Sequence, residues 1–350
     1  MIGDRIRQAR MAAGLSLRQL AEKTNSYVSA QAIHKYELGQ ATPGSDVLIH
    51  VAKALNVKVE YFFRTDSVRV TLSEPTYRKR RAVSSKQLQS LRAKVVEWLE
   101  KNLEVESLFP YERSPGVILP DLKEREIKEM NDVENLAVSL RRLWELGMDP
   151  IENLTEVLED RGVKVVLLES EDNFDGLSCW AKKGKPVILV RIGLPGDRQR
   201  SDLAHELGHL IMHVSPNMDE EKAAFRFSGA FLVPKEVVFR ELGKKRHTID
   251  FAELLMLKKK YGMSMQQWIY RAKDLSIISE SRASEFFRLF REKGWNRVEP
   301  GFALPSEEPE RFKRFLLQAV TERLISAVRA AEILGHPFKE FRKSLQVEFA

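Results

Sequence analysis

The first 64 residues alternate short amphipathic segments with turn signals. Apolar residues recur at three- and four-residue steps, and glycine, asparagine, serine and proline gather near residues 14–16, 24–26 and 39–44. Ser16 is placed to cap one helix and Ser29 to cap the next, with a tight turn between them. The pattern predicts a bundle of about five short helices that contains a helix-turn-helix.

The second helix of this pair carries a face that suits the major groove of DNA. It would present Ala30, Gln31, His34 and Lys35, which offer hydrogen bonds to base edges, room for close approach and partners for phosphate. The candidate DNA contacts are Arg18, Ser29, Gln31, Ala32, His34 and Lys35. The pattern alone is equally compatible with a solvated helix in a small bundle.

Residues 65–120 are predicted to form a basic, helical linker. A basic cluster at residues 77–81 could add phosphate contacts, or it could be a solvated part of the linker. A strongly helical pattern follows at about residues 85–103. Three prolines and a glycine within residues 107–120 then predict an extended connection and a domain boundary.

The following region predicts a predominantly helical α+β domain. We expect helices at about residues 121–147 and 151–161, and strands at 163–168 and 186–190, with a turn near residues 173–176. A small sheet would therefore lie just before the histidine-rich segment near residue 205.

The C-terminal third continues with helical periodicity over residues 251–295 and 307–345, interrupted by the proline-bearing stretch 300–309. Several aromatic residues could line a groove, but their spacing favours core packing; they are Trp268, Phe286, Phe287, Phe290 and Trp295. The predicted domains are thus 1–64, 65–120, 121–245 and a helical extension, 246–350.

Composition narrows the possible chemistry. A chain of 350 residues that is 43% hydrophobic can bury more than one core. We expect a cytoplasmic protein, because no run of 18 apolar residues occurs and the first residues lack the apolar segment of a signal peptide. The formal charge of +7 favours polyanionic partners only weakly. Cys179 is the single cysteine, so any zinc must be bound by histidines and carboxylates.

His205, Glu206 and His209 form an HExxH pattern. On a helix, residues four apart project from the same face, so both imidazoles can reach one metal ion. Zinc held in this way lowers the pKa of its water to about 7, and the Glu206 carboxylate could accept the proton and pass it to a leaving amine. The pattern therefore predicts amide hydrolysis; the alternative is a helix with two unrelated histidines.

A catalytic zinc site needs a third protein ligand. Pro216 ends the motif segment, and Glu221 begins an apolar stripe in the next helix that would turn its carboxylate toward the motif helix. Glu220 is nearly as well placed, and His213 is a further rival. Both acids could also serve only as favourable charges at a helix N-terminus.

Roles for the neighbouring residues stay open from sequence alone. Arg198, Arg200 and His213 could stabilise an oxyanion, although a structural salt bridge is the favoured role of either arginine, so we assign none of them. Cys179 could bind zinc in a latent state, but packing is favoured beside Trp180.

The run from Val28 to Gly39, with Gly14-Leu15-Ser16 before it, resembles the phage-repressor (Cro/C1, or XRE) helix-turn-helix family over about residues 3–63. Leu17 departs from the glutamine common there, and Asn25-Ser26-Tyr27 lengthens the turn. The resemblance implies binding to double-stranded operator DNA, and such proteins usually pair as homodimers across two half-sites.

A second resemblance covers the motif region. The segments Asp175 to Ser178, Pro186 to Leu189, Leu203 to His213 and Glu221 to Pro234 are similar to the ImmA/IrrE family of zincin-like metallopeptidases. The resemblance implies that His205, His209 and Glu221 bind Zn²⁺ and that Glu206 is the general base. Ser201-Asp202 and Phe225 depart from the family pattern, which usually has Asn or Asp at the latter position.

Together these features predict a transcription regulator whose zinc endopeptidase domain cleaves a repressor-like protein, similar to relatives that inactivate repressors during stress or prophage induction. An alternative is a DNA-binding repressor or antitoxin whose zinc domain is a sensor or interaction module without turnover. The presence of Glu206 favours the endopeptidase over the domain without turnover, because a purely structural zinc needs no general base.

Overall fold

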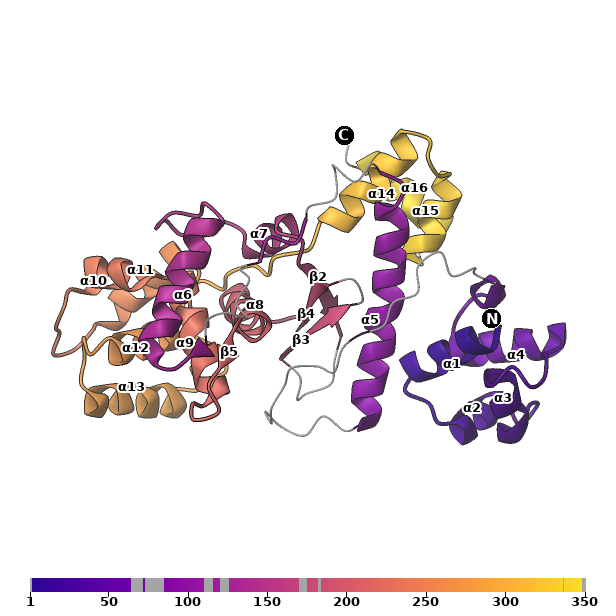
Figure 1. Cartoon of the computed structure of the whole chain (residues 1–350), viewed down its shortest axis with the longest axis horizontal. Coiled ribbons are helices and arrows are strands. Elements are labelled where there is room, and N and C mark those ends of the chain that lie inside the picture. Colours follow the sequence, from indigo (N-terminus) through magenta and orange to yellow (C-terminus); the bar gives the residue numbers. More distant parts are fainter. Residues whose placement is uncertain are drawn as a thin grey trace. The chain divides into compact units, whose positions relative to one another are not determined.

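The computed structural model describes residues 2–63, 72, 85–109, 116–119, 126–169, 175–181, 184–335 and 337–347 (Figure 1). Helices dominate, with two small sheets. Contacts divide the chain into two compact units. Unit 1 holds the described residues of 1–72, 82–110 and 315–350, and unit 2 holds those of 73–81 and 111–314. No helix among the described residues has the length and apolar character needed to cross a bilayer.

Unit 1 begins with the predicted helical bundle. Its elements are α1 (Ile2–Ala12), α2 (Leu17–Lys23), α3 (Ala30–Glu37), α4 (Ser45–Leu55) and a 3₁₀ helix, η1 (Val59–Phe63). The Ser16 and Ser29 side chains accept hydrogen bonds from the backbone of Gln19 and Ala32, so both predicted caps are confirmed. The core contains fully buried Ile6, Leu20, Ile33 and Val51.

The rest of unit 1 is built around a long helix, α5 (Ser85–Glu106), where a helix was predicted. The Ser90 hydroxyl on α5 donates a hydrogen bond to the Ala12 carbonyl at the end of α1. The C-terminal helices are α14 (Arg311–Thr321), α15 (Ala327–Leu334) and α16 (Phe338–Val347). Arg329 on α15 forms an ion pair with Glu104 on α5, with 2.6 Å between Nη2 and Oε1. The predicted C-terminal extension is thus shared between the units, and the domain boundaries stay a prediction.

Unit 2 contains a three-stranded sheet in the order β2 (Lys164–Leu168), β4 (Lys185–Arg191), β3 (Gly176–Ala181). β4 is parallel to β2, with Val165 opposite Ile188, and antiparallel to β3. The two predicted strands are confirmed to within a few residues. β3 was not predicted, because its Gly-Leu-Ser-Cys-Trp-Ala sequence lacks the β-branched residues that mark β2 and β4.

The helices of unit 2 surround the motif. They are α6 (Met130–Leu143), α7 (Leu154–Asp160), α8 (Gly196–Ile211), α9 (Glu220–Leu232), α10 (Lys235–Leu242), α11 (Phe251–Tyr261), α12 (Met265–Asp274) and α13 (Glu280–Glu292). The helix predicted from residue 121 begins only at Met130, where a capping box between Glu129 and Asp132 starts it. The two residues of β1 (Glu126–Ile127) instead pair in parallel with β5 (His213–Val214).

The core of unit 2 takes up most of the aromatic residues singled out in the C-terminal third. Trp268, Phe286 and Phe290 are buried, and Phe287 and Trp295 pack partly buried against the same cluster, which favours the core interpretation. The basic cluster at residues 77–81 and the first half of the predicted turn at 173–176 lie outside the described residues.

Candidate metal centre and nucleic-acid interface

Helix α8 presents the HExxH residues from its last two turns. His205 and His209 lie one turn apart and face the beginning of α9. The two helices approach closely because Gly208 has no side chain: a Cβ there would lie 3.1 Å from the Phe227 ring on α9. Asp219 caps α9 by accepting a hydrogen bond from the Lys222 backbone, which fixes where this helix begins.

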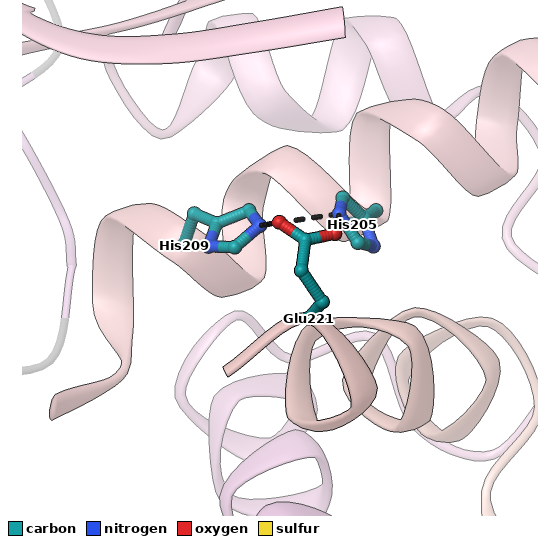
Figure 2. A group of neighbouring side chains, drawn as sticks. All are labelled: His205, His209 and Glu221. Atoms are coloured by element: carbon teal, nitrogen blue, oxygen red, sulfur yellow. Dashed lines mark hydrogen bonds and ion pairs between the residues drawn. The ribbon is translucent and has the colours of Figure 1, made fainter. Parts of the chain in front are cut away.

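Three side chains converge in the space between these helices (Figure 2). The Nε2 atoms of His205 and His209 are 3.1 Å apart. The Glu221 carboxylate lies across both rings, with Oε2 at 3.5 Å from His205 Nε2 and Oε1 at 3.4 Å from His209 Nε2. Among the described residues, these three side chains form the group that could hold a metal ion.

The spacing of these atoms fits zinc. A tetrahedral ion with ligand distances of about 2.0–2.1 Å separates its ligand atoms by about 3.3–3.4 Å. The three observed separations, 3.1, 3.4 and 3.5 Å, scatter closely around that value. Two imidazole nitrogens and one carboxylate oxygen are also a donor set that zinc accepts in catalytic sites, where a fourth position is left open.

The charges of the group are mutually stabilising. Burial raises the pKa of Glu221, but hydrogen bonds and charges from His205 and His209 outweigh it and hold the pKa below its usual value. Burial lowers the pKa of His209, whereas the hydrogen bond with Glu221 and the nearby carboxylates produce a net rise. An ionised carboxylate therefore lies against the His209 imidazole, whose proton a metal ion would displace.

The geometry separates Glu221 from its two rivals. Glu220 Oε1 lies 3.3 Å from Nδ1 of His209, which is the ring nitrogen directed away from Glu221. Glu220 is therefore placed to orient His209, in the way that partners of metal-binding histidines commonly do. His213 is exposed in β5, outside the group.

Glu206 lies beside the histidines and is 8% exposed. It packs against β3, where a Cβ on Gly176 would lie 3.0 Å from Glu206 Cγ and 3.1 Å from its Oε1. Burial raises the pKa of Glu206, and the opposing effects of His205, His209 and the Ser178 hydroxyl do not cancel this rise. A carboxyl group with a raised pKa is better suited to accept a proton and later release it.

The predicted DNA contacts gather around the second helix of the helix-turn-helix. Arg18, Ser29, Gln31, His34 and Lys35 are exposed, on α2, at the cap of α3 or on α3 itself. Ala32 is half-buried and packs against the bundle core. The lengthened turn is accommodated by Asn25 and Ser26, which both adopt the left-handed conformation, with φ of 53° and 59°.

Family models match the regions that contain the two candidate sites. Residues 158–273 match the model of the IrrE N-terminal-like domain, a zinc metallopeptidase family, and residues 6–62 match the helix-turn-helix model. The chain is a fusion of an XRE-type helix-turn-helix with an ImmA/IrrE-like domain. The matched part of the IrrE-like domain includes His205, His209 and Glu221. No curated protein and no solved structure gave a match.

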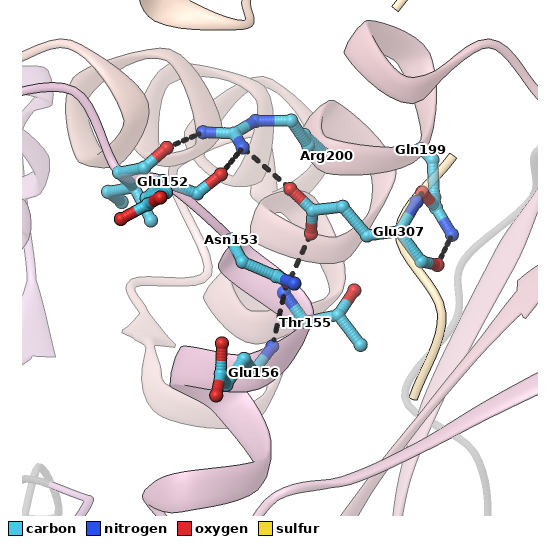
Figure 3. Close-up of polar contacts among 8 residues, drawn as sticks. Glu152, Asn153, Thr155, Glu156, Gln199, Arg200 and Glu307 are labelled. Atoms are coloured by element: carbon cyan, nitrogen blue, oxygen red, sulfur yellow. Dashed lines mark hydrogen bonds and ion pairs between the residues drawn. The ribbon is translucent and has the colours of Figure 1, made fainter. Parts of the chain in front are cut away.

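The extended segment 299–310 holds the first half of α8 in the IrrE-like domain (Figure 3). Gln199 and Glu307 exchange two hydrogen bonds, of 2.8 and 2.6 Å, between side chain and backbone. The Glu307 carboxylate accepts hydrogen bonds from Arg200 Nη1 at 2.6 Å and from the Thr155 backbone N–H at 2.7 Å. The start of α8 approaches so closely that a Cβ on Gly196 would lie 2.0 Å from the Pro305 carbonyl oxygen.

These contacts settle what the two candidate arginines do in the structure. Arg200 is buried in its ion pair with Glu307, and Arg198 binds Asp175 at 2.9 Å on the surface. Both therefore form the salt bridges that sequence favoured. Cys179 is buried in β3, directly after Ser178, whose hydroxyl faces Glu206. Because neighbouring residues of a strand point to opposite faces, its thiol faces away from Glu206.

A buried ion-pair cluster that sequence did not indicate fixes α9 in place. Glu134 on α6 binds Arg226 on α9 and Arg271 on α12, and Arg271 also donates to the Val233 carbonyl at 3.1 Å. Burial raises the pKa of Glu134, but the two arginines outweigh it and hold the pKa below its usual value. From sequence alone, a carboxylate on an amphipathic helix is expected to face solvent. The role of Glu134 in joining three helices is therefore evident only from the three-dimensional fold.

Proposed function

We propose that this chain is a DNA-binding transcription regulator whose IrrE-like domain is a zinc-dependent endopeptidase acting on a repressor-like protein. The observation that carries the proposal is the meeting of His205, His209 and Glu221 beside a buried Glu206. The family match of residues 158–273 and the exposed face of α3 support it.

In this proposal His205, His209 and Glu221 hold the zinc ion. Zinc supplies Lewis acidity, which polarises a carbonyl and makes water a nucleophile near neutral pH. Glu206 would accept a proton from the attacking water at its carboxylate and deliver it to the nitrogen of the departing amine. Its burial supports the role, because a desolvated carboxylate releases its proton less readily than an exposed one and so retains it until the amide bond breaks.

We also propose that the helix-turn-helix binds operator DNA as a homodimer. Helix-turn-helix proteins of this kind read two half-sites related by a two-fold axis, so dimerisation follows from the geometry of the DNA. Sedimentation of the full chain with and without operator tests this. A monomer under both conditions would refute the dimer and leave the peptidase proposal intact.

The decisive experiment compares zinc content with cleavage of a candidate repressor protein that carries a helix-turn-helix of the same type. We expect one bound zinc in wild type, its loss in Glu221→Ala, and retained zinc with abolished cleavage in Glu206→Gln. Glu220→Gln is the matched control beside Glu221, and it should keep zinc. Zinc bound to wild type without cleavage of the repressor would refute the endopeptidase and favour a zinc-stabilised regulator.

A further inference from the structure

A row of three aromatic side chains begins at the metal centre. Phe225 follows Glu221 by one helical turn on α9, and its ring lies edge-on to His205 with 5.3 Å between centroids. Tyr270 on α12 is 6.3 Å from Phe225, and Phe287 on α13 is 4.3 Å from Tyr270. These three residues, here called the aromatic row, connect three helices and touch one of the proposed zinc ligands.

Core packing does not account for the first two members of the row. Phe287 packs against the hydrophobic core of unit 2, but neither Phe225 nor Tyr270 belongs to that core among the described residues. Tyr270 is 40% exposed and is the one residue of α12 classed as exposed, whereas Trp268 on the same helix is fully buried. Large apolar surface left in water beside a site commonly marks a place where another molecule binds.

The Glu134 cluster makes this surface rigid. Arg226 directly follows Phe225, Arg271 directly follows Tyr270, and both arginines bind the same buried carboxylate. The two rings therefore project from helices that are joined through α6. The backbones that carry the two rings are therefore held relative to one another before a partner binds.

The surroundings distinguish between possible occupants. Asp219, Glu220 and Glu221 place acidic groups at the end of the row that adjoins His205. Phosphate groups would be repelled at that end, which disfavours single-stranded nucleic acid stacked along the whole row, whereas Lys273 Nζ lies 5.5 Å from the Tyr270 ring centroid at the row's middle. A neutral apolar side chain meets no such repulsion and gains from contact with the faces and edges of the rings.

We propose that Phe225 and Tyr270 form the subsite that receives a large apolar or aromatic side chain of the protein substrate next to the scissile amide. This inference rests on the proposed function and adds a substrate class to it. Phe225 is specificity-determining and takes no part in the proton transfer.

The test uses two metal-binding probes, N-acetylphenylalanine hydroxamate and N-acetylglycine hydroxamate, titrated calorimetrically into the zinc-loaded full chain. Both probes share the group that binds the metal and differ only in the benzyl side chain. We expect wild type to bind the phenylalanine probe about tenfold more tightly or better, since burial of an aromatic ring contributes at least that much.

The variants then locate the preference. Phe225→Asn and Tyr270→Ser should each reduce the ratio of the two affinities to less than about threefold, while the glycine probe binds all proteins equally. Phe225→Leu should restore part of the preference. Phe302→Ser is the matched control, because Phe302 is 59% exposed on segment 299–310 and should leave the ratio unchanged.

Each remaining outcome overturns the proposal in a different way. Equal affinity of wild type for both probes would show a metal centre without the subsite, so the proposed function would survive alone. Binding of neither probe would refute the metal centre and the subsite together. An oligodeoxythymidylate whose binding is weakened by Tyr270→Ser, without any preference between the hydroxamates, would instead identify the row as a base-stacking surface.

Discussion

Glu159 provides a stability prediction that depends on pH. Its carboxyl group lies on α7, is 7% exposed and accepts a hydrogen bond from the Arg311 backbone at 3.1 Å. Burial raises its pKa from 4.5 to about 7, although that hydrogen bond and the charges of Lys164, Arg311 and Arg314 act in the opposite direction. The folded state therefore holds a proton that the unfolded chain releases at lower pH.

The direction in which stability changes with pH follows from this difference in pKa between the folded and unfolded states. With a folded pKa above the unfolded value, the stabilising contribution of the Glu159 proton is fully present below pH 4.5 and is lost as the pH rises to about 7. Above pH 7 the ionised, buried carboxylate disfavours the folded state by about 3 kcal/mol, at 1.36 kcal/mol per pH unit. Glu159→Gln removes this charge and keeps an oxygen that can accept the Arg311 hydrogen bond.

We expect Glu159→Gln to raise the free energy of unfolding by about 3 kcal/mol at pH 8 and to leave it nearly unchanged at pH 4. Urea unfolding followed by tryptophan fluorescence measures this, since Trp144, Trp180, Trp268 and Trp295 all belong to unit 2. Glu156→Gln, on the exposed side of the same helix, is the control and should change stability by less than about 0.5 kcal/mol at either pH.

Equal stability gains at pH 4 and pH 8 would refute this reasoning, because the effect would then come from packing rather than from a buried charge. A loss of stability in Glu159→Gln at pH 8 would also refute it. In that case the ion pairs of the carboxylate would exceed its cost of burial, and its pKa would lie below 4.5 rather than above it.

Two further predictions concern the residues that position the centre. Glu134→Gln should destabilise unit 2 by about 3–5 kcal/mol, because the buried Arg271 loses its counter-charge and Arg226 keeps only Asp274. Urea unfolding measures this, and Glu253→Gln in a half-exposed pair should cost less than about 1 kcal/mol. Gly176→Ala should slow cleavage about tenfold by pushing Glu206 aside. Its zinc content should not change, and Gly116→Ala, which has open space, should retain wild-type cleavage.

Sequence predicted those parts of the fold and site that depend on local spacing. The pairing of His205 with His209 is a property of one helix, and the inward direction of Glu221 follows from the apolar stripe of α9. The helix caps at Ser16 and Ser29 could also be predicted from sequence, because the cap residue and the three residues that follow it determine a cap.

The rest depends on partners that are distant in the chain. Glu134 meets residues 92 and 137 positions away, and no periodicity on α6 distinguishes it from a solvated acid. The short pairing of β1 with β5 is set by where α8 ends rather than by strand propensity. Phe225 was noticed only as a departure from a family pattern, and its contacts with His205 and Tyr270 required the fold.

Segment 299–310 has a consequence for the synthesis of the protein. Glu307 secures the first half of α8 through Gln199, from which it is separated by 108 residues. A ribosome that adds about 5–20 residues per second needs about 5–20 seconds to cover that interval. The helix-turn-helix bundle leaves the ribosome before residue 307 is added, and the helix that carries both histidines acquires this support only after that interval. Under the proposed function, a nascent chain that ends before residue 307 would carry the DNA-binding bundle and a metal centre whose helix still lacks this support.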